Sequence, residues 1–224
     1  MDIEDRPSPN CDARPAGTPV DMLVLHYTGM PTGAAALARL LDIEYEVSAH
    51  YLIEEDGRIF RLVAEADRAW HAGVSYWRGH RDVNARSIGI ELVNPGHEYG
   101  YRPFPEPQMA ALEALSRDIL ARHPIPPRNV VGHSDVAPAR KTDPGELFDW
   151  RSLAARGIGL WPAPAASGPA DVMDALSAIG YDISDYALAL AAFQRHFRPA
   201  EVHGVADPDT LRWLQGLAEL CERS

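Results

Sequence analysis

Two histidines that close short apolar runs, together with one aspartate, are the residues of this sequence best suited to hold a metal ion. His26 follows the run MLVL, His133 follows NVVG, and Asp143 lies in a polar loop ten residues beyond His133. A buried imidazole needs a partner for its ring nitrogens. Two imidazoles and one carboxylate form the three-ligand set of a catalytic zinc site, whose fourth position is left for water. The alternative, buried histidines that hydrogen bond to the backbone, stays open from these residues alone.

The remaining histidines have simpler interpretations. The chain contains nine of them, and most are expected to be structural. His123 lies beside prolines at the end of a predicted helix, which is typical of a surface or capping residue. His50 begins a predicted strand, where we favour a structural role with satisfied ring nitrogens.

Apolar periodicity predicts the elements that carry these residues. Strands are predicted at 22–28, 87–93 and 129–133, and a hairpin with an Asp-Gly turn at 50–63. Helices are predicted at 34–41 and 107–123, the second from its regularly spaced apolar residues. His26 and His133 therefore lie at strand ends. The segment 134–150 is long and rich in turn residues, which is typical of a functional loop.

Composition excludes several classes of partner. The 21 Lys and Arg against 32 Asp and Glu give a net charge of −11, which argues against binding to nucleic acid or to anionic membranes. The apolar stretches are shorter than the roughly 20 residues that a membrane span needs. The first ten residues lack the features of an export signal, and two distant cysteines, Cys11 and Cys221, make no disulfide framework. These observations predict a cytoplasmic protein, or a periplasmic one if the chain is a processed form.

Five blocks of the chain, in order, resemble one known family. They are LVLHYT, SAHYLIEEDGRIFRLV, AWHAGVSYW, SIGIELVN and VVGHSDVAPARKTDPGELFDW, and together they span roughly residues 21–161. The blocks are similar to those of the zinc-dependent N-acetylmuramoyl-L-alanine amidases of the type-2 family, which are related to peptidoglycan recognition proteins, and above all to its AmpD-like members. One block alone would be weak evidence for the family, but five blocks in the same order make the resemblance specific.

The resemblance implies roles for particular residues. His26, His133 and Asp143 match the family's ligands for one Zn²⁺ per chain, and Glu91 and Lys141 match its catalytic residues. Glu91 would transfer protons between water and the leaving amine, and Lys141 would stabilise the oxyanion. The alternatives are an exposed strand carboxylate or a salt-bridge partner for Glu91 and a solvated loop lysine for Lys141.

Four further residues are expected to contact substrate. Trp70 and His71, in the block AWHAG, are expected on a loop over the site, where similar enzymes contact substrate; packing of Trp70 into the core is the alternative. Tyr27 stands where AmpD-like enzymes often carry a polar amide, so it bears on substrate preference. Because the chain as a whole is acidic, recognition of substrate carboxylates is expected to rest on local cations, and Arg140 is one of them.

The C-terminal part resembles a small helical peptidoglycan-binding domain. AFQRHF, a turn at Gly204 and a helix start at DPDTLRWL carry this resemblance, and a bundle that only stabilises the enzyme is the alternative. A Pro/Ala-rich segment precedes it. We therefore expect an α/β catalytic domain at 1–161, a linker at 162–170 and a three-helix domain at 171–224. The catalytic domain should have a central mixed sheet flanked by helices, with the zinc in a groove.

These inferences together predict a function. The chain should hydrolyse the amide between N-acetylmuramic acid and L-alanine in peptidoglycan or in anhydro-muropeptides, during cell-wall turnover. The alternatives are a non-catalytic muropeptide-binding protein and a zinc peptidase that cuts within the stem peptide. The sequence makes no prediction of oligomeric state.

Overall fold

The computed structural model describes residues 2–223, so the outermost limits of the two predicted domains, residues 1 and 224, lie outside it. Its strands are β1 (Ile3–Asp5), β2 (Cys11–Ala13), β3 (Met22–Tyr27), β4 (Tyr51–Ile53), β5 (Ile59–Arg61), β6 (Asp67–Ala69), β7 (Ser87–Leu92) and β8 (Val130–Gly132). Its α-helices are α1 (Gly33–Leu41), α2 (Val83–Arg86), α3 (Gly96–Tyr99), α4 (Glu106–Arg122), α5 (His133–Val136), α6 (Trp150–Ala155), α7 (Val172–Ile179), α8 (Tyr186–Phe197) and α9 (Pro208–Arg223). Short 3₁₀ turns lie at Ile43–Tyr45, Pro127–Asn129 and Ile183–Asp185.

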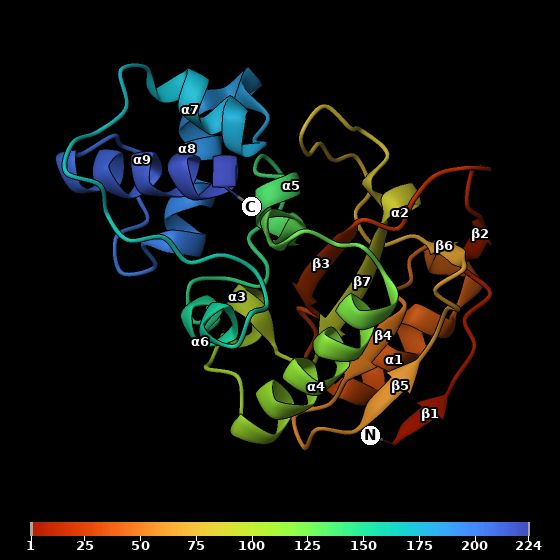
Figure 1. The fold of residues 1–224 in the computed structure, drawn as a ribbon. Helices are drawn as coiled ribbons and strands as arrows, with labels where there is room; N and C mark the ends of the chain where they lie inside the picture. The colour runs from red at the N-terminus through yellow and green to blue at the C-terminus, as the bar shows by residue number, and fades with distance from the viewer. Residues whose placement is uncertain (1, 224) are drawn as a thin grey trace.

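A six-stranded sheet forms the centre of the molecule (Figure 1). Its order is β1-β5-β4-β7-β3-β8, and β3 pairs in parallel with both β7 and β8. β4 runs parallel to β7 and antiparallel to β5, so the sheet is mixed, as predicted. The predicted hairpin is present, with Gly57 at φ +89° in its turn, a conformation that glycine adopts without steric cost.

The two faces of the sheet are covered by different helices, because alternate residues of a strand point to opposite sides. Leu23 and Leu25 of β3 belong to a core with apolar residues of α4 and α6. Met22 and Val24 belong to a core with the C-terminal helices. On this second face, α1 packs over Leu52 of β4. His26 lies two residues beyond Val24 and therefore also points to the second face.

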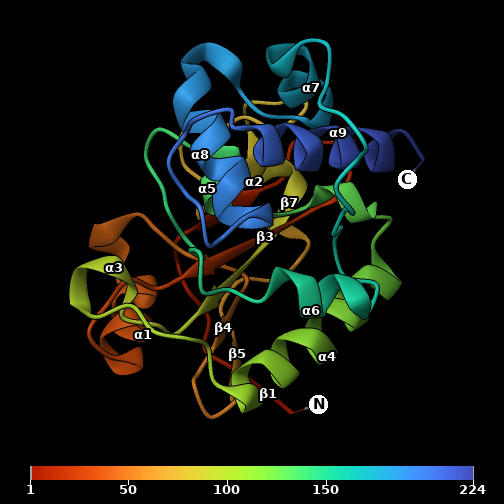
Figure 2. The same cartoon turned by 90° about the vertical axis from the view of Figure 1, so that its left-hand side faces the viewer.

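The C-terminal helices share a hydrophobic core with the sheet domain. Met22, Val24 and Val131 of the sheet lie in one buried cluster with Leu176 of α7 and Phe193 of α8. Figure 2, like Figure 1, places α8 beside α5. In the predicted linker, the Ala165 N–H donates to the Arg212 carbonyl of α9 at 2.8 Å. The division into two domains at residues 162–170 stays a prediction, and the hydrophobic core continues from one side of it to the other.

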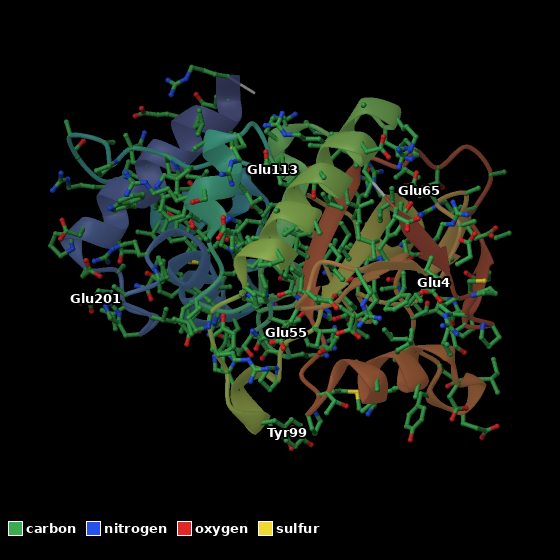
Figure 3. All side chains as sticks on the ribbon, turned by 90° about the horizontal axis from the view of Figure 1, so that it is seen from below. Glu4, Glu55, Glu65, Tyr99, Glu113 and Glu201 are labelled. Atoms are coloured by element: carbon green, nitrogen blue, oxygen red, sulfur yellow. The ribbon has the colours of Figure 1, made fainter. Side chains whose placement is uncertain are left out.

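The C-terminal end of helix α4 is held by hydrogen bonds to Glu65, in the segment that follows β5. Glu65, labelled in Figure 3, accepts hydrogen bonds from Arg122, His123 and the Tyr51 hydroxyl, each at 2.7 Å. This contact fixes α4 over the face that carries Leu23. Within residues 2–223, the helices are all too short or too polar to cross a bilayer.

Candidate metal and catalytic site

The candidate site is built at the carboxyl ends of the three neighbouring parallel strands β7, β3 and β8. His26 lies near the end of β3, and Glu91 of β7 is its direct partner in register. His133 follows β8 immediately and is the first residue of α5, whereas the sequence placed it in the strand. The carboxyl ends of parallel strands meet at one edge of the sheet, so the register brings these three side chains together.

Three ligand atoms converge at this edge. The Nδ1 atoms of His26 and His133 are 2.9 Å apart, and each lies 3.1 Å from Oδ2 of Asp143. Zinc–nitrogen and zinc–oxygen bonds of about 2.0–2.1 Å in a tetrahedron put ligand atoms about 3.3 Å apart. All three residues are buried. The triangle is therefore close to the size that a tetrahedral zinc site would need, and a small expansion would accommodate the ion.

The surroundings of His133 fix which of its nitrogens carries the proton. Its Nε2 lies 3.1 Å from the carbonyl oxygen of Ala72, which can only accept a hydrogen bond. Nε2 is therefore the N–H, and the Nδ1 lone pair faces His26 and Asp143. This is the tautomer that a metal ligand requires.

A chain of hydrogen bonds fixes His26 in the same way. The Ser87 hydroxyl donates to the Val83 carbonyl at 2.6 Å, so its oxygen accepts from His71 Nε2 at 3.1 Å. His71 Nδ1 then accepts from His26 Nε2, also at 3.1 Å. The His26 Nδ1 lone pair is left to face the other two ligands.

His71 thus lies behind the site. The residue is only 8% exposed, although it contributes to the cavity lining. A Cβ added at Gly89, on β7, would lie 2.5 Å from Cγ of His71, so glycine is required there to make room for the ring. This placement favours a positioning role over the substrate contact that the sequence predicted.

Electrostatics keep His26 and Asp143 in the forms that bind a cation. Burial, reinforced by the neighbouring His133, lowers the pKa of His26 to about 4, so its imidazole is neutral at pH 7. Burial disfavours the charge of Asp143, but its contacts with His133 and His26 hold the pKa of this carboxyl well below its usual range. Neutral imidazoles and an ionised carboxylate are the ligand forms that zinc requires.

Glu91 lies beside the three ligands in a low-dielectric setting. Within residues 2–223, its Oε2 atom is solvent-inaccessible and has no hydrogen-bond partner. Burial, and then the charge of Asp143, raise the pKa of Glu91 well above its ordinary value. A carboxyl group whose pKa is raised is a better proton acceptor than an ordinary surface carboxylate, which suits proton transfer.

A cavity of about 410 Å³ opens in front of these groups. α1 and α3 contribute to its lining, as does the segment 140–143. Every sequence-predicted site residue except His26 lines it: Tyr27, Trp70, His71, Glu91, His133, Arg140, Lys141 and Asp143. The volume is typical of a small-ligand site.

Trp70 and Arg140, two of the predicted substrate-contact residues, also have protein partners. Trp70 Nε1 donates to Asp12 at 3.2 Å, which orients the indole at the cavity wall. Arg140 donates to the carbonyls of Ala72 and Val74, so its guanidinium also holds the segment that orients His133.

Sequence reasoning missed several cavity residues. The Tyr27 hydroxyl lies 2.9 Å from His97 Nδ1 and 3.1 Å from Thr142 Oγ1, and both of these residues line the cavity. Arg39 of α1 is a further cation in the lining. The position of Thr142 between Lys141 and Asp143 was a usable signal, whereas nothing near Arg39 or His97 in the sequence marked them.

Comparisons with known proteins agree with this geometry. The Amidase_2 family model, described as N-acetylmuramoyl-L-alanine amidase, matches residues 16–146. The chain is 39% identical to the N-acetylmuramoyl-L-alanine amidase AmiD of Escherichia coli, over 89% of this chain and 83% of AmiD. It is 37% identical to the 1,6-anhydro-N-acetylmuramyl-L-alanine amidase AmpD of Haemophilus influenzae, over 64% of this chain and 85% of AmpD.

Solved structures show the same similarity. A complex of E. coli AmiD with the substrate anhydro-N-acetylmuramic acid-L-Ala-D-γ-Glu-L-Lys superposes with a TM-score of 0.80 at 39% identity, covering 92% of this chain and 91% of AmiD. AmpDh3 of Pseudomonas aeruginosa, in complex with an anhydromuramic pentapeptide, gives a TM-score of 0.81 at 38% identity, covering 92% of this chain and 94% of AmpDh3.

Proposed function

Because the chain belongs to the N-acetylmuramoyl-L-alanine amidase family, we propose that it hydrolyses the amide between N-acetylmuramic acid and L-alanine in peptidoglycan fragments, including anhydro-muropeptides. The observation that carries the proposal is the convergence of two imidazole lone pairs and one carboxylate beside the half-buried Glu91, whose Oε2 atom is solvent-inaccessible. A protein that only bound muropeptides would need neither an open metal position nor a carboxyl group of raised pKa.

His26, His133 and Asp143 are proposed to hold one Zn²⁺. Two nitrogens and one oxygen are a common donor set for catalytic zinc, and both tautomers are already set for it. A zinc ion bound there supplies a Lewis acid for the amide carbonyl and lowers the pKa of a water molecule to about 7.

Glu91 is proposed to transfer the proton, and Lys141 is proposed to stabilise the negative charge that develops during hydrolysis. Glu91 takes the proton of the attacking water at a carboxylate oxygen and donates it to the nitrogen of L-alanine as the amide bond breaks. Lys141 lines the same cavity and stabilises the negative charge that develops on the amide oxygen.

The rest of the cavity wall is proposed to position the substrate. Trp70 presents an aromatic face suited to a sugar ring or to the lactyl-peptide junction. Tyr27, whose hydroxyl is held by His97 and Thr142, also lines the cavity. Arg140 keeps a positive charge at the rim while it holds the segment 72–74.

Mass spectrometry of the products tests the proposal. Zinc-loaded protein incubated with an anhydro-muropeptide should release the intact stem peptide and the free anhydro sugar. A cut within the peptide would identify a zinc peptidase, and binding without cleavage would identify a receptor. Glu91→Gln is the matched control, because it keeps the zinc ligands and removes the proton acceptor.

Two predictions about the protein's setting need separate experiments. The predicted cytoplasmic location is checked by cell fractionation, and recovery in the periplasmic fraction would favour the periplasmic alternative.

The proposal that α7–α9 bind peptidoglycan is checked by co-sedimentation of the full chain with insoluble cell wall. An equal amount left in the supernatant with and without wall would assign these helices a purely structural role.

A further inference from the structure

A buried carboxylate joins the C-terminal helices to the turn that carries a metal ligand. Asp135 lies on α5, two residues after His133, and is 1% exposed. Its carboxylate accepts hydrogen bonds, each of 2.7 Å, from the Gly132 N–H, the Tyr181 hydroxyl and His196 Nδ1. Gly132 belongs to the same turn, whereas Tyr181 follows α7 and His196 lies on α8.

The donors from the C-terminal helices are held rigidly. The His196 ring stacks between Trp150 and Phe197, with ring centroids 3.8 and 3.9 Å away. The Tyr181 ring packs edge-on against Trp77 at 5.2 Å and is 1% exposed. These donors therefore meet Asp135 at fixed points, as Figures 1 and 2 indicate by the close approach of α8 to α5.

A buried carboxylate without its donors is costly, because it has lost its hydration. Asp135 would respond by moving, and this change would release the Gly132 N–H. The same turn also holds a second ligand, since the Ser134 N–H donates to the Asp143 carbonyl at 2.9 Å. A shift of residues 132–135 would therefore displace both His133 and Asp143.

We propose that Tyr181 and His196 are positioning residues of the metal site, acting through Asp135. The C-terminal helices are then a structural part of the metal centre, whether or not they also bind cell wall. This inference rests on the proposed zinc function, because it concerns the geometry of the zinc ligands.

The affinity for zinc of the full chain, measured by competition with a chromophoric chelator, tests the proposal. Tyr181→Phe removes only the hydroxyl donor to Asp135. Thr210→Val is the matched control, because Thr210 is a fully buried residue of α9 whose hydroxyl bonds Asp207 and Gln194 rather than Asp135. Loss of an outer hydrogen bond typically weakens metal binding by about 10- to 100-fold. Since Asp135 acts one residue further out, we expect roughly 3- to 10-fold for Tyr181→Phe and less than twofold for Thr210→Val.

A rescue pair separates hydrogen bonding from packing. His196→Leu and His196→Asn both lose the ring stack, but asparagine places an amide N–H where Nδ1 lay. Asparagine should restore most of the zinc affinity, and the absorption spectrum of the Co²⁺-loaded protein should be perturbed in the leucine variant only.

The outcomes are distinct. Equal zinc affinities for Tyr181→Phe and Thr210→Val, or for the two His196 variants, would overturn the positioning role. Failure of the unmodified chain to bind zinc would instead overturn the proposed function itself.

Discussion

Replacing Ser87 by alanine tests whether the hydrogen-bond chain behind His26 controls metal binding. Ser87 is fully buried, and its oxygen accepts from His71 Nε2, while His71 Nδ1 accepts from His26 Nε2. The substitution removes the acceptor at the end of this chain and leaves the metal ligands in place. His71 is then left with a buried N–H that no longer has an acceptor.

The loss of zinc affinity depends on whether the metal-free or the metal-bound variant contains the unsatisfied N–H of His71. In the Ser87→Ala variant without metal, His26 and His71 can both change tautomer, because His26 Nδ1 can then donate to Asp143. With metal bound, the His26 Nδ1 lone pair is committed, so His71 must keep its proton on Nε2. A buried unsatisfied donor costs about 1–3 kcal/mol, which corresponds to a loss of zinc affinity of roughly 5- to 150-fold.

Chelator competition measures this loss, and Ser116→Ala supplies the control. Ser116 is a fully buried residue of α4 whose hydroxyl has no hydrogen-bond partner in the described part of the chain. Its removal should leave zinc affinity unchanged. If Ser87→Ala binds zinc as tightly as the unmodified chain does, the tautomer argument for His26 is wrong.

Three other substitutions probe separate parts of the structure. Glu91→Gln should lower kcat by about 10²- to 10⁴-fold without changing the zinc content, measured by product assay and metal analysis. Gly89→Ala should weaken zinc binding and lower Tm, because its Cβ would lie 2.5 Å from the His71 ring. Burial, and then Arg14, lower the pKa of His50 to about 3, whereas unfolded histidine titrates near 6.5. Its contribution to stability is therefore full above pH 6.5 and falls toward pH 3, by about 2 kcal/mol between pH 7.5 and 5. Urea unfolding of His50→Gln should show a correspondingly weaker pH dependence, and an unchanged one would refute the assignment.

The strands that carry the site were predictable, because their signal is local. The buried strands β3, β7 and β8 are short apolar runs, and β3 and β8 have a histidine at or just beyond their ends. The edge strand β1 was missed, since two of its three residues are exposed and its order comes from parallel pairing with β5. Helix α5 was missed inside the predicted loop for a similar reason. Its four residues are held by Asp135 and by packing against α8, which no local periodicity reveals.

The metal ligands could be inferred from the sequence and its resemblance to a family, but their supports could not. Ser87 begins a strand and gives no sign that it ends a hydrogen-bond chain leading to His26. Asp135 was seen as one of several polar loop residues, and its partners lie 46 and 61 positions further along the chain. Sequence spacing carries no information on contacts of this range, which depend on how the helices pack on the sheet.

The supports explain why each ligand keeps its orientation in an acidic chain. His26 is held through His71 and Ser87, and His133 through the Ala72 carbonyl, which Arg140 also contacts. Arg140, which the sequence predicted to contact substrate, thus also supports the backbone segment that orients His133. Because Arg140 is partly committed to backbone carbonyls, Lys141 and Arg39 are left as the main cationic side chains of the cavity lining, beside the metal ion that the ligands are proposed to hold. Recognition of muropeptide carboxylates should accordingly depend on these local charges and only weakly on bulk salt.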